Sequence, residues 1–82
     1  MQRAEATGME TEPRSLAKAD PFDKAFIDSM IPHHRSAIEM AEVAARETNS
    51  PEIKDLAKGI VEAQKREISQ MKQWRRQWYP QG

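Results

Sequence analysis

The sequence predicts an all-α protein, in which two long helices form an antiparallel hairpin and two hairpins pair as a homodimer into a four-helix bundle. Three observations support this prediction. Two helix-start signals divide the chain, amphipathic periodicity follows each of them, and the apolar faces are too broad for a single hairpin to bury. Nothing in the sequence resembles a β-strand.

The first helix is predicted over about residues 21–48. Asp20 supplies an N-cap carboxylate, and Pro21 takes the first helical position, where a missing N–H costs nothing. A second start follows at once, with Ser50 as the N-cap of a helix over about residues 51–78. Because the connection between them is so short, the two helices must lie antiparallel.

Residues 1–19 mix Glu, Thr, Arg, Gly and Pro with hardly any apolar periodicity. Such a segment cannot bury enough apolar surface to offset the entropy lost on ordering. We therefore predict a flexible N-terminal tail over residues 1–19 and a helical hairpin domain over residues 20–79.

Composition excludes several classes of function. The chain has 13 Lys and Arg against 13 Asp and Glu, which argues against a broad electrostatic surface for nucleic acid or anionic membrane. No apolar run approaches the roughly 20 residues of a membrane span, and no signal peptide is recognisable. The absence of cysteine excludes disulfides, thiolate zinc sites and thiol catalysis.

Helical periodicity of about 100° per residue indicates which side chains are buried. On the first helix, one broad face carries Phe22, Phe26, Ile27, Met30, His33, His34, Ala37, Ile38, Met40, Ala41 and Ala44. On the second helix, the matching face carries Ile53, Leu56, Ala57, Ile60, Gln64, Glu67, Ile68, Met71, Trp74 and Trp78. Two such faces leave apolar flanks uncovered, and this predicts a homodimer.

Polar side chains interrupt these inner faces at one level of the hairpin. A buried carboxylate or imidazole is costly unless it is paired or binds a ligand. Antiparallel pairing brings Met30 and the histidine pair one turn later, His33 and His34, to the level of Glu67 and Met71. The sequence therefore predicts a cluster of two histidines, two methionines and one glutamate.

Imidazole nitrogen and thioether sulfur together favour a soft or borderline metal ion. Copper as Cu(I) is the best match, with Cu(II), Zn(II) or Ag(I) as alternatives. Met40, one heptad beyond His33, is a further candidate ligand. The paired Glu-x-x-His pattern of di-iron bundles is absent, as are phosphate-binding loops and the zinc-protease motif, so we expect a protein that is not an enzyme.

Each feature also has a purely structural interpretation. The two histidines follow Pro32, so one imidazole could cap a backbone carbonyl in a kinked helix. The methionines could simply fill gaps in the core. Glu67 could form a salt bridge with His33 or His34 across the hairpin.

Two segments resemble a known family. Phe26-Ile27-Asp28-Ser29-Met30-Ile31-Pro32-His33-His34, with Ala37-Ile38-Glu39-Met40-Ala41 after it, is similar to the bacterial domain-of-unknown-function family numbered three hundred and five. The later Gln64-x-x-Glu67-Ile68-x-x-Met71-x-x-Trp74 is similar to the second helix of that family. The resemblance covers about residues 20–78.

The resemblance implies a ferritin-like helical bundle, commonly exported, with some members similar to copper-binding proteins that use Met and His. It implies a secreted, periplasmic or cell-envelope location for this chain. The metal-binding positions that it marks are Met30, His33, His34, Met40, Glu67 and Met71.

The leading hypothesis is a copper-binding bundle that buffers, carries or confers tolerance to the metal. A second hypothesis is a metal-independent dimeric interaction module, in which the His and Glu side chains form a buried polar network that fixes the helix register. A third, a small ferritin-like oxidoreductase, is disfavoured because few carboxylates face inward.

Overall fold

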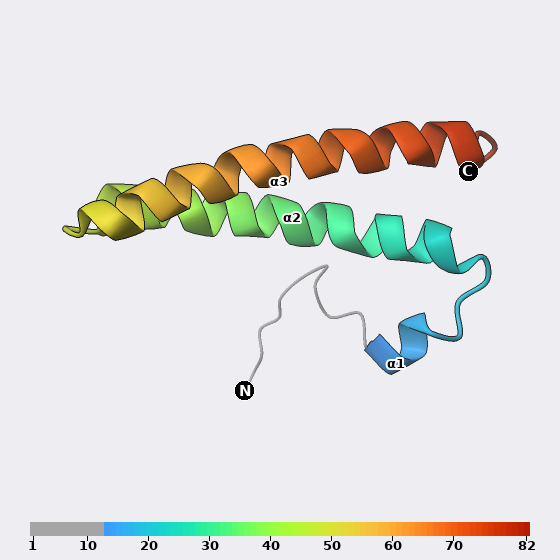
Figure 1. The fold of residues 1–82 in the computed structure, drawn as a ribbon. Helices are drawn as coiled ribbons and strands as arrows, with labels where there is room; N and C mark the ends of the chain where they lie inside the picture. Colours follow the sequence, from blue (N-terminus) through green and yellow to red (C-terminus); the bar gives the residue numbers. More distant parts are fainter. Residues whose placement is uncertain (1–12) are drawn as a thin grey trace.

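A computed structural model describes residues 13–82, and this part of the chain contains three helices and no strand. They are α1 (Pro13–Leu16), α2 (Phe22–Glu47) and α3 (Pro51–Trp78). The two long helices lie side by side and run in opposite directions, with α1 below the start of α2 in this view (Figure 1). The prediction of an all-α fold is confirmed for these residues.

The beginning of α2 differs from the prediction. Pro21 is the N-cap residue, in an extended conformation with φ −77° and ψ 140°, and no side chain caps the helix. The helix therefore begins at Phe22, and Asp20 lies one residue too early to act as the N-cap. Asp23 still places a negative charge in the first turn, where it interacts favourably with the helix dipole.

The beginning of α3 has the predicted cap. The Ser50 hydroxyl accepts a hydrogen bond of 3.1 Å from the backbone N–H of Ile53 and donates one of 3.0 Å to Glu52. Backbone hydrogen bonding, followed by the bond from the Ser50 hydroxyl, holds the pKa of Glu52 below its usual value. Within the connection, the Ser50 N–H donates to the Thr48 hydroxyl over 3.0 Å. These local bonds satisfy backbone donors that would otherwise lack partners.

The core between α2 and α3 is small. The buried apolar side chains among the described residues are Ile27, Ala41, Ala57 and Met71. Large apolar side chains remain exposed on both helices: Phe22, Phe26, Met40, Val43, Ile53, Leu56, Trp74 and Trp78. The amphipathic faces are therefore only partly covered within one chain.

An ion pair joins the first part of α2 to the last part of α3, away from the connection between them. The Arg75 guanidinium donates to both carboxylate oxygens of Asp28, over 2.7 and 3.3 Å, and also to the backbone carbonyls of Tyr79 and Gly82. The hydrogen bond to Asp28 raises the pKa of Arg75 above its usual value. Arg75 thus connects α2 to the C-terminal end of α3.

Part of the predicted flexible tail, residues 1–12, lies outside the described residues. Its remainder includes α1, a four-residue helix that the sequence analysis did not predict and that contacts α2. Within residues 13–82, no helix is both long enough and apolar enough to cross a membrane.

Candidate metal site

His34 is the buried polar side chain of the α2/α3 interface, with 8% of its surface exposed. Its Nδ1 lies 2.9 Å from the backbone carbonyl oxygen of Met30, one turn earlier on α2. Its Nε2 lies 2.6 Å from Oε1 of Glu67 on α3. A carbonyl oxygen can only accept, so Nδ1 donates to Met30, and Nε2 shares a second hydrogen bond with the Glu67 carboxyl group.

These two contacts fix the orientation of the imidazole. The carbonyl of Met30 holds the proton on Nδ1, which leaves Nε2 as the nitrogen directed toward α3. Hydrogen bonding of one ring nitrogen to a carbonyl is the usual way in which a metal-binding histidine is held in position. A metal ion at this site could bind Nε2 only without a proton on that nitrogen.

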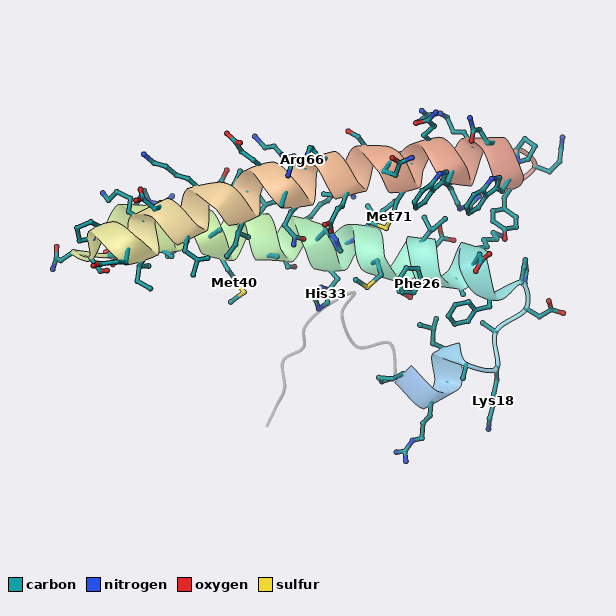
Figure 2. The ribbon with its side chains drawn as sticks, viewed as in Figure 1. Lys18, Phe26, His33, Met40, Arg66 and Met71 are labelled. Atoms are coloured by element: carbon teal, nitrogen blue, oxygen red, sulfur yellow. The ribbon has the colours of Figure 1, made fainter. Side chains whose placement is uncertain are left out.

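Thioether sulfur atoms are available beside this imidazole. Met30, His34, Glu67 and Met71 line one groove of about 260 Å³ between α2 and α3, together with Phe26, Gln70 and Trp74. Met71 is buried, and Figure 2 shows it between the two helices. The side chain of Glu67 is 58% exposed. The groove therefore combines one imidazole, two thioethers and one carboxylate, a donor set that fits a soft or borderline ion.

Four of the six predicted metal-binding residues thus line one groove, and two do not. His33 is exposed, with its ring centroid 6.5 Å from that of His34, and Met40 is 71% exposed. Figure 2 shows both side chains projecting away from α3. Consecutive residues point about 100° apart on a helix, so His33 and His34 cannot both face α3.

Met40 belongs to a second groove, nearer the connection. This groove has a volume of about 300 Å³ and is lined by Ala37, Met40, Ala41, Ala44, Ile53, Leu56, Ala57 and Ile60. Met40 lies six residues beyond His34, about 9 Å along the helix axis and on a different side of it. The structure therefore separates Met40 from Met30, His34 and Met71, which line the other groove.

The sequence analysis did not assign Phe26, Gln70 or Trp74 to the site. The spacing contains a signal for two of them, because Phe26 lies four residues before Met30 and Trp74 lies three residues after Met71. Among residues 13–82, no three His, Cys, Asp or Glu side chains form a cluster that could hold a metal ion.

The structure only partly matches the structural interpretation of the Pro32 segment. Pro32 lies inside α2 without ending it. It lacks the N–H that would pair with the carbonyl of Asp28, four residues earlier. His34 does not compensate for this loss, because its Nδ1 bonds to the carbonyl of Met30.

The family model of a domain of unknown function (DUF305) matches residues 1–80. The chain belongs to this family. The match confirms the resemblance that rests on the two quoted segments, and it covers both long helices of this DUF305 chain. An uncharacterized protein, L153, of Acanthamoeba polyphaga mimivirus is 43% identical over 49 residues, which make up 60% of this chain and 32% of that protein.

Solved structures of CopM are similar to this DUF305 chain. CopM in the Cu(II)-bound form is 41% identical, with a TM-score of 0.84, over 96% of this chain and 54% of the CopM chain. The Cu(I)-bound form is 40% identical, with a TM-score of 0.81, over 95% and 56%. The Ag-bound form is 43% identical, with a TM-score of 0.80, over 84% and 50%. This chain spans about half the length of CopM.

Proposed function

We propose that this chain binds copper, preferentially as Cu(I), in the groove between α2 and α3. The observation that carries the proposal is the convergence of Met30, His34, Glu67 and Met71 on that groove. The similarity to CopM, whose structures include Cu(I)-, Cu(II)- and Ag-bound forms, supports it. Copper is the cargo in this proposal, and the protein acts as a buffer, carrier or tolerance factor without catalysis.

Each donor has a distinct part in the proposed site. The unprotonated Nε2 of His34 binds the ion in place of its hydrogen bond with Glu67, while the carbonyl of Met30 continues to hold Nδ1. The sulfur atoms of Met30 and Met71 supply the soft donors that favour Cu(I). The exposed side chain of Glu67 can then turn to water or bind the ion itself.

Two finer points belong to the same proposal. The exposed His33 and Met40 remain predicted ligands for a separate ion outside this groove, so replacing either of them should leave the affinity of the His34 groove unchanged. The family resemblance still predicts a cell-envelope or extracellular location.

We also propose that a second copy of the hairpin covers the exposed apolar side chains and completes a four-helix bundle. Met40, Ile53 and Leu56 are exposed along one groove, and Phe26 and Trp74 are exposed along the other. Residues 13–82 bury four apolar side chains, a small core for their number, so a homodimer would bury much more apolar surface. Light scattering of the metal-free protein should give the mass of two chains, and a stable monomer would contradict the dimer.

The test of copper binding is an anaerobic Cu(I) titration against a competing chelator. Wild type should bind stoichiometrically, and His34→Gln should lose most of the affinity because an amide nitrogen is a poor metal ligand. His33→Gln is the matched control, since it removes the neighbouring exposed imidazole. Equal losses in both variants, or no binding by a folded wild type, would contradict the proposed site.

One observation favours the metal-independent module instead. The contacts of His34 are complete without a metal, because both ring nitrogens already have partners. In that case the His34–Glu67 pair fixes the helix register across the interface. Removing chelatable metal would then leave the thermal unfolding temperature unchanged, whereas a copper-binding protein should unfold at a higher temperature when loaded.

A further inference from the structure

An aromatic side chain forms part of the groove that contains the candidate donors. Trp74 lines this groove together with His34 and both methionines. It also lines an adjoining groove of about 210 Å³, in which Trp78 takes part. Trp78 does not line the groove of His34. The two tryptophans therefore differ in their position relative to the candidate donors.

The contact between the two indoles gives Trp74 a defined orientation. The rings are 5.3 Å apart between centroids and only 6° from parallel. One face of Trp74 is therefore covered by Trp78, and stacking restricts rotation of both side chains. Trp74 is 37% exposed, less than Trp78 at 49%.

Aromatic rings attract cations through the negative potential of their faces, and tryptophan is the strongest of them. Such a ring offers no lone pair to a metal, so it occupies one side of a site without adding a conventional ligand. Cu(I) and Ag(I) are compatible with a few soft donors, whereas Cu(II) favours a tetragonal set of nitrogen and oxygen ligands. A wall that supplies no ligand therefore favours Cu(I) or Ag(I), which need few donors, over Cu(II), which needs a fuller ligand set.

We propose that Trp74 is a specificity-determining residue, whose indole forms the wall of the His34 groove that a bound monovalent cation contacts. This inference rests on the proposed copper site and deepens it. Phe26, which lines the same groove, extends the apolar wall and helps to exclude water from the ion. The chemical class selected is a soft monovalent ion, Cu(I) or Ag(I).

Tryptophan fluorescence tests the contact directly. The chain has two tryptophans, so Trp74→Phe leaves only Trp78 and Trp78→Phe leaves only Trp74. Ag(I) is redox-stable, and as a heavy atom it quenches an indole that it touches. Titration with Ag(I) should strongly quench the Trp78→Phe variant and leave the Trp74→Phe variant nearly unchanged. Equal quenching of the two variants would overturn the inference.

A second measurement separates ion selectivity from structural support. Trp74→Leu should lower the affinities for Ag(I) and Cu(I) by about 2- to 30-fold, the range of a cation–π contact, and change Cu(II) affinity much less. Trp78→Leu is the matched control and should preserve the ratio of Cu(I) to Cu(II) affinity. Circular dichroism of both variants establishes that the helices are intact. Equal losses for all three ions in Trp74→Leu would mean that the indole only supports the fold.

The outcomes distinguish this inference from the proposed function. If wild type takes up no Ag(I) or Cu(I), the copper site and the role of Trp74 are both wrong. If wild type and Trp78→Phe bind Ag(I) while the Trp74 emission does not change, the copper site stands and only the inference about Trp74 is overturned.

Discussion

Two of the grooves between α2 and α3, one lined by Met40 and one by His34, have similar volumes and different chemistry. The groove near the connection is formed by alanine, isoleucine, leucine and a single methionine, Met40. The groove farther along contains an imidazole, a carboxylate and two thioethers among its aromatic walls. The same amphipathic pattern thus produces a purely apolar surface at one end and a set of metal donors at the other. Periodicity alone does not separate packing from binding.

The largest expected effect is on the free energy of unfolding, when one methionine from each groove is replaced. Met71→Ala should lower the free energy of unfolding by about 2–5 kcal/mol, because it leaves a cavity at a buried position. Met40→Ala should cost much less, no more than about 0.5 kcal/mol for a hairpin without its partner copy, because Met40 is exposed there. Urea denaturation of the metal-free variants measures both values. A large loss from Met40→Ala would show that a partner copy buries that side chain.

Acid should weaken Cu(I) binding at the His34 groove. Protons compete with the ion for Nε2, so affinity falls as pH falls. Where the nitrogen is mostly protonated, each further pH unit costs about tenfold in affinity, or about 1.4 kcal/mol. Chelator competition at about pH 7.5 and about pH 5.5 measures the change. Constant affinity would exclude His34 as a ligand.

Replacing sulfur without changing volume sharpens the comparison of the two grooves. Met71→Leu conserves the volume of the side chain and removes the thioether, so the fold should persist while Cu(I) affinity falls by about tenfold or more. Met40→Leu makes the same chemical change in the apolar groove and should leave the affinity unaltered. If the two variants behave alike, Met71 is not a ligand.

A smaller effect distinguishes the two helix starts. Ser50→Ala should lower the free energy of unfolding by about 1 kcal/mol, because it removes the hydroxyl that accepts from the N–H of Ile53. Asp20→Ala should have little effect, because no side chain caps α2. Thermal unfolding at neutral pH measures the difference. An equal loss from Asp20→Ala would contradict the observed start of α2.

Most of the helical architecture could be predicted from local signals. The Ser50–Pro51 start was predicted correctly because an N-cap serine followed by proline acts within one turn of the backbone. The start of α2 was misplaced by one residue, since the backbone at Pro21 is extended. The short helix α1 was missed, because four residues carry no periodic pattern.

The candidate site was predicted only in outline. Antiparallel pairing placed the histidines level with Glu67, and the structure joins His34 to Glu67. Spacing could not choose between His33 and His34, because both lie within a broad apolar face. Trp74 was predicted on the inner face of the second helix without a place in the site, and the structure puts it in the same groove as Met71.

The sequence by itself determined the helical class, the cap at Ser50, the amphipathic faces and the family membership, because these depend on neighbours along the chain or on motif identity. Only the tertiary structure decided that His34 is buried while His33 is exposed. It also decided that Met40 is separated from the groove of Met71. The physical reason is that packing between α2 and α3 sets how far each helix is rotated about its own axis. A repeating apolar pattern leaves that rotation uncertain by about one residue, or about 100°.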